Sequence, residues 1–507
     1  MVRLNLVTGE KAVSIPAHEN VLLSEILRIH GQAPAMPCAG QGRCGKCRVI
    51  ASGALSAPSS AERAHLTQEE LARGVRLACC VRVEGDCRVT LSDSARSQIC
   101  LSGVMDAVSL RPRFHVCGAA VDIGTTTLAA SLYGADGTLL AQASAANPQA
   151  AWGADVISRI EAALKGAGGD LAACVRRDVD GLLHQMAAQA RIASGEIDAL
   201  VITGNTAMLH LFTETSPEPL SHAPFAAERL FGEVCPAGSL GLSACPGASV
   251  YLPRCMSAFV GADIATALLA SGICGKSETR MLVDIGTNGE MALWHRGALF
   301  CCSTAAGPAF EGAGLSMGMH GQDGAVDHVT IRDGALLPHV IGEASPRGIC
   351  GSGVIDALAC LLETGALDET GLLEAAPAPI APPVALTQKD VRMVQLAKSA
   401  ISAGLRTLLR TVNISCPDVA ELAVAGGFGS YLNAASAGRI GLIPEELVPK
   451  VRVLGNAALS GASMLLLDET LAAACERLAQ GAETLELSAN PIFTQYYTEG
   501  MFFSPTD

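Results

Sequence analysis

The sequence predicts a multidomain chain in which a small α+β domain of the β-grasp type precedes a larger, internally duplicated α/β domain. Three observations predict this architecture: two alternating stretches followed by a helical stripe near the N-terminus, a cysteine-rich loop behind them, and a five-residue motif that occurs twice in the body. The chain has 507 residues, which is too many for one ordinary domain.

The first elements indicate a β-grasp order. Residues 3–8 and 11–15 alternate apolar and polar side chains around Thr8-Gly9-Glu10, which is typical of a hairpin. Asn20 is expected to cap a helix that Gly31 ends. The apolar stripe of this helix consists of Val21, Leu22, Ile26, Leu27 and Ile29. A cysteine-rich loop and a strand over 47–51 follow, so the order is β-β-α-loop-β.

Four cysteines have the spacing of iron–sulfur ligands. Cys38, Cys44 and Cys47 form a C-x5-C-x2-C pattern, and Cys79 lies 32 residues beyond Cys47. A [2Fe-2S] cluster takes four thiolates, and one tight loop can wrap three of them. Glycines 40, 42 and 45 would let the backbone fold closely and point N–H groups at the sulfurs. Zinc sites more often use paired C-x2-C knuckles, so we predict a [2Fe-2S] cluster.

Spacing alone does not choose between Cys79 and Cys80 as the fourth ligand. The loop resembles those of plant-type and adrenodoxin-type ferredoxins, and the Leu-Ala-Cys context of this resemblance favours Cys79. Cys80 and Cys87 are then bystanders.

The repeated motif indicates a nucleotide site. Val121-Asp-Ile-Gly-Thr125 recurs as Val283-Asp-Ile-Gly-Thr287, and strand-like runs follow at 128–133 and 291–294. A strand that ends in Asp before a Gly-Thr turn can bind phosphate through backbone N–H groups and hydroxyls, with Mg²⁺ near the carboxylate. One copy is equally well explained as a buried strand ending in a turn. Two copies indicate the actin/Hsp70/sugar-kinase (ribonuclease H-like) superfamily, in which each half supplies one phosphate loop.

That superfamily also needs a glycine-rich adenosine loop. The segment 425–430, after the apolar run 422–425, is in the right order for it. The glycine cluster 348–353 is a second candidate, and packing at a helix start explains it equally well. Two other motifs are set aside, because 270–277 lacks the first glycine of a Walker loop and 314–318 lacks the strand and helix of a nucleophile elbow.

The combination of these features resembles the reductive activators of corrinoid proteins, over nearly the whole chain. Besides the cysteine loop 38–47, the resemblance rests on the segments Asp122–Thr126, Gly153–Arg159, Gly204–Thr206, Gly261–Asp263, Asp284–Glu290, Ser303–Glu311, Gly348–Gly353 and Gly426–Leu432. One departure is that only residues 95–116 separate the cluster domain from the first phosphate loop, whereas some members carry an extra segment there.

The resemblance implies an ATP-dependent enzyme that passes a low-potential electron from its [2Fe-2S] cluster to the Co(II) corrinoid of a partner, restoring Co(I) for methyl transfer. It implies that Asp122 and Asp284 arrange Mg²⁺ and the attacking water. Glu290 and Glu311 are candidates for positioning water or metal, and a solvated or structural role suits them at least as well. The phosphate-binding residues would be Gly124, Thr125, Thr126, Gly286, Thr287 and Asn288. The adenosine-binding residues would be Gly426, Gly427 and Gly429.

The implied domains are a ferredoxin-like domain over 1–94, a linker over 95–116 and an ATPase domain over 117–507, with halves of about 117–280 and 281–507. The formal charge is −14, of which residues 1–94 contribute +2 and the remainder −16. This acidic balance without basic runs argues against nucleic acid and anionic membranes. The N-terminus lacks a signal-peptide core and no run is long enough for a membrane span, so a cytoplasmic location is expected.

The expected partners are a corrinoid protein, an upstream electron donor and a second copy of the chain. The sequence has no Asp-x-His-x-x-Gly cobalamin motif, so the corrinoid should belong to a separate protein. A small-molecule kinase would need no cluster, and a chaperone would need a peptide-binding domain. The remaining alternative is an ATP-gated electron donor to a different low-potential metalloenzyme. It differs from a corrinoid activator only in the protein that accepts the electron.

Overall fold

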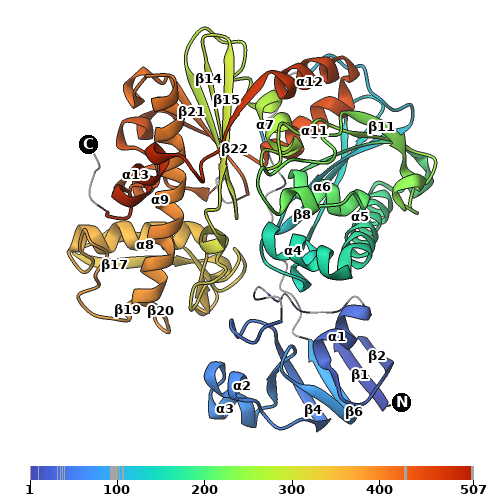
Figure 1. The fold of residues 1–507 in the computed structure, drawn as a ribbon. Helices are drawn as coiled ribbons and strands as arrows, with labels where there is room; N and C mark the ends of the chain where they lie inside the picture. Colours follow the sequence, from blue (N-terminus) through green and yellow to red (C-terminus); the bar gives the residue numbers. More distant parts are fainter. Residues whose placement is uncertain are drawn as a thin grey trace. The chain divides into compact units, whose positions relative to one another are not determined.

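The computed structural model describes residues 2–8, 11–30, 32, 34, 36, 38, 40–91, 101, 103–104, 108–427 and 431–503 (Figure 1). The chain divides into two compact units, and each is described by itself. The first comprises residues 1–96 and 147–175, and the second comprises residues 97–146 and 176–507. None of the helices in the described ranges combines the length and the apolar character that a membrane span requires.

A mixed sheet with the strand order β2-β1-β6-β4-β5, and with β3 paired to β6, forms the core of the first unit. Its strands are β1 (Val2–Thr8), β2 (Lys11–Ala17), β3 (Val21–Leu22), β4 (Arg48–Leu55), β5 (Val75–Leu77) and β6 (Arg82–Leu91). The pairing of β1 with β2 is antiparallel, from Val2–Ala17 to Thr8–Lys11, so the predicted hairpin is confirmed. Its turn residues Gly9 and Glu10 lie outside the described residues.

The predicted start of the first helix was wrong. Helix α1 spans Leu23–Ile29 and has Leu22 as its N-cap, whereas Asn20 adopts a left-handed φ of 65°. Val21 and Leu22 instead pair with Val83 and Arg82 of β6. Their amides and carbonyls are therefore already used in the sheet, and the helix cannot begin before Leu23. The predicted end, Gly31, lies outside the described residues.

The first unit also contains several helices. Short helices α2 (Ser60–His65) and α3 (Gln68–Ala72) follow β4, and each begins with a capping box, on Ser59 and Thr67. Residues 147–175 add η1 (Pro148–Ala151), α4 (Val156–Ala162), η2 (Ala163–Ala167) and the start of α5 (Gly168–Ala190).

Two sheets with the same internal plan form the core of the second unit, which confirms the predicted duplication. The first has the order β11-β12-β10-β7-β8-β9, and the second β22-β21-β13-β14-β15-β23. In the first sheet the strands are β7 (Cys117–Ile123), β8 (Thr127–Gly134), β9 (Leu139–Ala146), β10 (Ile197–Gly204), β11 (Glu233–Pro236) and β12 (Ser249–Leu252). In the second they are β13 (Arg280–Ile285), β14 (Gly289–His295), β15 (Ala298–Thr304), β21 (Glu421–Ala425), β22 (Val451–Gly455) and β23 (Ala482–Leu485).

The duplication extends to a glycine at the end of a parallel strand in each sheet. β10 runs parallel to β7, and β21 runs parallel to β13. A Cβ on Gly204 would lie 2.6 Å from the Ile123 carbonyl oxygen, and one on Gly426 would lie 2.7 Å from that of Ile285. Any larger residue would push the strand ends apart, so glycine is required at both positions to keep the Asp-bearing strands close to their neighbours.

Two helices, α7 (Ala262–Ser271) and α11 (Ala457–Leu467), pack against each other in the second unit. They cross closely, because a Cβ on Gly461 would lie 1.9 Å from the carbonyl oxygen of Thr266. α11 also packs on β7 and β10, although it follows β22 in the chain. The C-terminal part of the sequence therefore completes the core around the first sheet.

The remaining elements of the second unit lie around the two sheets. The helices are α6 (Thr206–Thr213), α8 (Gly351–Thr364), α9 (Gln388–Thr411), α10 (Ala434–Arg439), α12 (Ala472–Gly481) and α13 (Pro491–Glu499). The small strands are β16 (Ala325–Arg332), β17 (Ala335–Val340), β18 (Gly348–Ile349), β19 (Ala378–Ala381) and β20 (Val384–Leu386). α6 packs against β10 of the first sheet, α9 packs against β14 and β15 of the second, and α13 packs on α9 (Figure 1).

The described part of the expected linker is bonded to the body of the second unit. The amides of Val104, Arg111 and Arg113 donate to the carbonyls of Leu454, Leu467 and Leu466 at 2.9 Å each. Val104, Arg111 and Arg113 thus lie against the end of β22 and helix α11. The linker boundaries of 95 and 116 stay a prediction.

Candidate functional site

The predicted cluster ligands lie in two pairs in the first unit. The Sγ atoms of Cys38 and Cys44 are 3.4 Å apart, and those of Cys47 and Cys79 are 3.3 Å apart. Among the described residues, no three His, Cys, Asp or Glu side chains converge as ligands of one metal ion. Two thiol pairs match a two-iron cluster, in which each iron takes two thiolates.

The loop glycines have the backbone geometry that the sequence predicts. Gly40, Gly42 and Gly45 have φ values of 78°, 70° and 65°. A Cβ on Gly45 would lie 2.9 Å from that of His65, so a side chain there is excluded sterically as well. Backbone N–H groups also point at the sulfurs: burial raises the pKa of Cys38, but bonds led by the amide of Arg43 outweigh it and lower the pKa.

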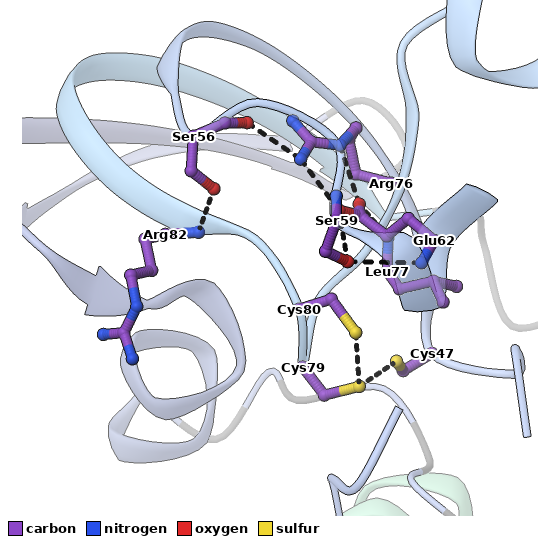
Figure 2. A network of polar contacts seen from close by, with 9 residues as sticks. All are labelled: Cys47, Ser56, Ser59, Glu62, Arg76, Leu77, Cys79, Cys80 and Arg82. Carbon is purple, nitrogen blue, oxygen red and sulfur yellow. Dashed lines mark hydrogen bonds and ion pairs between the residues drawn. The ribbon is translucent and has the colours of Figure 1, made fainter. Parts of the chain in front are cut away.

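The structure separates Cys79 from Cys80 by their contacts. Cys79 Sγ lies 3.3 Å from Cys47 Sγ, whereas the contact of Cys80 is with Cys79, at 3.6 Å (Figure 2). The contact with Cys47 and burial raise the pKa of Cys79, and burial with the neighbouring Cys79 raises that of Cys80, so their pKa values do not distinguish the two thiols. Cys87 lies in β6, buried beside Gly53. These placements support Cys79 as the fourth ligand.

A buried ion pair holds the Cys79 turn against α2 (Figure 2). Glu62 is fully buried and accepts hydrogen bonds from Arg76 Nε at 2.8 Å, Arg76 Nη2 at 3.0 Å and the Leu77 amide at 3.2 Å. Arg76 also donates to the Ser56 carbonyl at 2.9 Å. Burial raises the pKa of Glu62, but the Arg76 contact outweighs it and lowers the pKa, so the carboxylate is charged.

We expect Glu62→Gln to destabilise the cluster domain by about 3 kcal/mol, because it leaves the Arg76 guanidinium buried without its charge partner. The measurement is thermal unfolding followed by visible absorption of the loaded protein. Glu69→Gln is the matched control, since Glu69 is exposed on the neighbouring helix α3. Equal melting of the two variants would show that the pair does not stabilise the domain.

The second unit contains a cavity of about 250 Å³ where its two sheets present their Asp-bearing strands. The two repeated loops line it together, and so do Gly426, Gly427, Tyr431 and the glycine cluster at Cys350–Ser352. Every predicted catalytic, phosphate and adenosine residue that the structure describes lines this cavity. Gly429 lies outside the described residues. Both candidate adenosine loops thus border the same space.

Glu311 joins the two phosphate loops. Its carboxylate accepts hydrogen bonds from the Thr287 amide and hydroxyl at 2.9 Å each, and from the Thr126 hydroxyl at 2.5 Å. The hydroxyls of Thr126 and Thr287 are 3.3 Å apart. Glu311 therefore holds the two hydroxyls side by side, where both can face the same ligand.

Two asparagines repeat one arrangement on opposite sides of the cavity. Asn205 caps α6 through its side-chain oxygen, and its Nδ2 donates to Glu290 at 3.2 Å. Asn456 caps α11 through its oxygen, and its Nδ2 donates to Asp122 at 3.1 Å. Each asparagine is fixed by capping a helix, and its amide then orients a carboxylate from the other half of the duplicated domain.

Four carboxylates around the cavity repel one another. Burial raises the pKa of Asp122 to about 6, and that of Asp284 to about 7 with help from Asp122. Burial together with Asp122 and Asp284 raises the pKa of Asp263 to about 8. Burial, Asp263 and Asp284 raise the pKa of Glu290 well above its usual range. Such a cluster favours a cation, which would relieve the repulsion.

Comparison with known proteins identifies the domains that contain the two candidate sites. Family models match the 2Fe-2S iron-sulfur cluster binding domain over residues 6–84, the RACo middle region over 117–276, and the C-terminal domain of RACo, the ASKHA domain, over 278–507. The corrinoid activation enzyme RamQ of Eubacterium limosum is 35% identical over 425 residues, which cover 76% of this chain and 70% of RamQ. The chain belongs to the RACo family.

Two further relatives extend the comparison. The [Co(II) methylated amine-specific corrinoid protein] reductase of Methanosarcina barkeri is 27% identical over 348 residues, which cover 62% of this chain and 64% of the relative. The solved structure of a reductive activator for a corrinoid, iron-sulfur protein has a TM-score of 0.71 and 27% identity, and covers 100% of this chain and 99% of that one. The actin-like fold with an N-terminal 2Fe-2S domain is therefore that of the RACo family.

Sequence reasoning gave no role to three polar residues that contribute to this RACo-family cavity. Asn205 and Asp263 stand in segments of the family resemblance, and Asn456 stands outside all of them. A sequence pattern could have indicated the two asparagines. Each follows a glycine that ends a strand, and each caps the helix that comes next. Asp263 has no such signal, since only the fold brings it beside Asp122 and Asp284.

We expect Asp263→Asn to stabilise the nucleotide-free protein at pH 8, by on the order of 1 kcal/mol, because it removes a charge that costs more in the folded than in the unfolded chain. A carboxyl with a raised folded pKa lowers stability once the pH exceeds its unfolded value of 3.8, and the full loss is reached above about 8. The gain should therefore shrink toward pH 4.

Unfolding of EDTA-treated protein over this pH range is the measurement. Asp333→Asn is the matched control, since Asp333 is exposed in the β16–β17 turn. A variant that is no more stable than wild type at pH 8 would contradict the repulsion.

Proposed function

We propose that this chain is an ATP-dependent reductive activator that delivers one electron to the Co(II) corrinoid of a separate partner protein and so restores Co(I) for methyl transfer. The observation that carries the proposal is the presence, in one chain, of two thiol pairs at ferredoxin spacing and a cavity built by two phosphate loops. The names of RamQ, the amine-system reductase and the solved reductive activator describe activation or reduction of corrinoid proteins by those relatives.

The cluster residues of the proposal are Cys38, Cys44, Cys47 and Cys79. A [2Fe-2S] cluster held there would supply a one-electron carrier. Gly40, Gly42 and Gly45 let the loop close with its amides toward the sulfurs. The buried Glu62–Arg76 pair fixes the turn that carries Cys79. Residues 1–94 would form this ferredoxin domain, followed by a linker over 95–116 and the ATPase domain over 117–507.

The nucleotide residues of the proposal divide by chemistry. The N–H and hydroxyl groups of Gly124–Thr126 and Gly286–Asn288 would hold phosphates, and Gly426, Gly427 and Gly429 would face the adenosine. Asp122 and Asp284, with Glu290, would orient Mg²⁺ and the attacking water. No three described acidic side chains converge as direct metal ligands, which suits Mg²⁺ because it keeps several waters and binds substrate phosphates.

ATP can assist an uphill electron transfer only if it binds two states of the protein differently. Glu311 and the two threonine hydroxyls join both phosphate loops, so a nucleotide in the cavity contacts both sheets at once. We propose that this contact favours the state that reduces the corrinoid. The proposed setting is the cytoplasm, with an upstream electron donor and a homodimeric activator.

The test mixes chemically reduced protein with a purified Co(II) corrinoid protein and ATP under anaerobic conditions. Appearance of the Co(I) absorption band is expected, and the same mixture without the activator should stay Co(II). If no corrinoid protein is reduced while the activator still discharges into another low-potential metalloenzyme, the acceptor in this proposal is wrong.

A further inference from the structure

A second cavity, of about 650 Å³, lies in the C-terminal half of the second unit. Its walls come from α9, α10, η10 (Glu445–Lys450) and residues 500–503. It shares no lining residue with the nucleotide cavity. The proposed activity gives it no role.

Basic and hydroxyl groups from one face of α9 line this cavity. Lys398, Ser402 and Arg406 are spaced four residues apart, so their side chains lie one above the other on the helix. Arg439, at the end of α10, adds a third positive charge. Lys398 is 1% exposed and Ser402 is 6% exposed, whereas Arg439 is open to solvent. The cavity therefore has a buried basic wall and an accessible basic rim.

Lys398 is buried without a carboxylate partner. It donates one hydrogen bond to the Phe502 carbonyl, and its Nζ lies 4.8 Å from the centroid of the Phe503 ring. Among the described residues, no acidic group comes within ion-pair distance of it. An ammonium has three donors, and burial without an anion costs free energy. Burial lowers the pKa of Lys398 to about 7.

We propose that this cavity is a binding site for a small oxyanion, a phosphate or a carboxylate, held by Lys398 and Arg406 with Ser402 between them. Such a ligand would be the anionic partner that Lys398 does not have among the described residues. It would accept hydrogen bonds from the ammonium N–H groups that do not donate to the Phe502 carbonyl. A Cβ on Gly441 would lie 3.2 Å from Lys398 Nζ. The glycine therefore leaves room for the ligand beside the ammonium. Glu445 and Glu446 line the exposed side and favour ligands of low charge.

The test is binding of inorganic phosphate to the full-length protein, measured by equilibrium dialysis with the nucleotide site saturated by Mg-ADP. One phosphate per chain is expected. Lys398→Met should weaken binding by at least about tenfold, as for the loss of one charge-assisted hydrogen bond, and Arg439→Gln should weaken it less. Lys389→Met is the matched control, since Lys389 is exposed on the same helix and should leave the affinity unchanged.

Dialysis with two other anions identifies the class of ligand and the role of Lys398. Succinate in place of phosphate distinguishes a carboxylate from a phosphate site. Sulfate keeps its charge across the pH range, so its affinity should fall as the pH rises through about 7 and Lys398 loses its proton. The other charged groups facing the cavity are Arg406, Arg439, Glu445 and Glu446.

Three results would overturn the proposal. They are an absence of phosphate and succinate binding in the wild type, equal affinity in Lys398→Met and Lys389→Met, and sulfate binding independent of pH. If Lys398→Met does not fold, Arg439→Gln carries the comparison, because an exposed arginine can be replaced without disturbing the core.

Discussion

Asp284→Ala is expected to lower ATP turnover about a hundredfold or more while leaving the cluster domain unchanged. Asp284 is the next-to-last residue of β13, pairs in register with Glu290 of β14 and lines the nucleotide cavity. In our proposal its carboxylate orients Mg²⁺, and such a contact is worth several kcal/mol of transition-state charge stabilisation. The cysteine loop shares no residue with this cavity.

The measurements are steady-state ATP hydrolysis and the midpoint potential of the cluster. Asp284→Asn is the matched variant, because it keeps the shape of the side chain and removes the charge. Both variants should lose turnover and keep the wild-type potential. Full activity of Asp284→Asn would show that shape, not charge, is what the site requires.

Cys79→Ser is expected to abolish the visible absorption of the [2Fe-2S] cluster, and Cys80→Ser is expected to retain it. Cys79 contacts Cys47 at 3.3 Å, so its loss removes one of the two thiols of that pair. Cys80 contacts only Cys79 among the four predicted ligands. Because the two cysteines are adjacent, the two variants differ in position and not in chemistry.

Cluster content is measured by absorption and by iron and sulfide analysis after anaerobic reconstitution. Cys87→Ser is the control for a buried cysteine away from the loop, and it should bind a full cluster. A cluster in Cys79→Ser together with an empty Cys80→Ser would reverse the ligand assignment.

Structural features that depend on a few consecutive residues could be predicted from the sequence. The cysteine loop, its glycines and the two phosphate loops are short segments whose chemistry depends on local backbone geometry. The repeated motif also predicts the two similar sheets, because its two copies lie on β7 and β13, which occupy corresponding positions in the two sheets. Local propensity failed at α1, where pairing of Val21 and Leu22 with β6 overrides the cap that Asn20 suggests.

Features that depend on distant contacts could not be predicted. Asp263 reaches the cavity because α7 begins beside the strand ends, and Asn456 reaches Asp122 because α11 returns to the first sheet. Likewise, Lys398 looks like an ordinary helix lysine in the sequence. Only the packing of residues 500–503 over α9 buries it.

The central claim is that nucleotide binding at the duplicated site drives the electron to the corrinoid. It is tested by the Co(I) absorption band of a corrinoid partner mixed with pre-reduced activator, with and without ATP, for wild type and Asp284→Ala. We expect that wild type produces Co(I) only with ATP, and that the variant, although its cluster is reduced, does not produce it. Equal Co(I) formation by both proteins would show that ATP is not what drives the transfer.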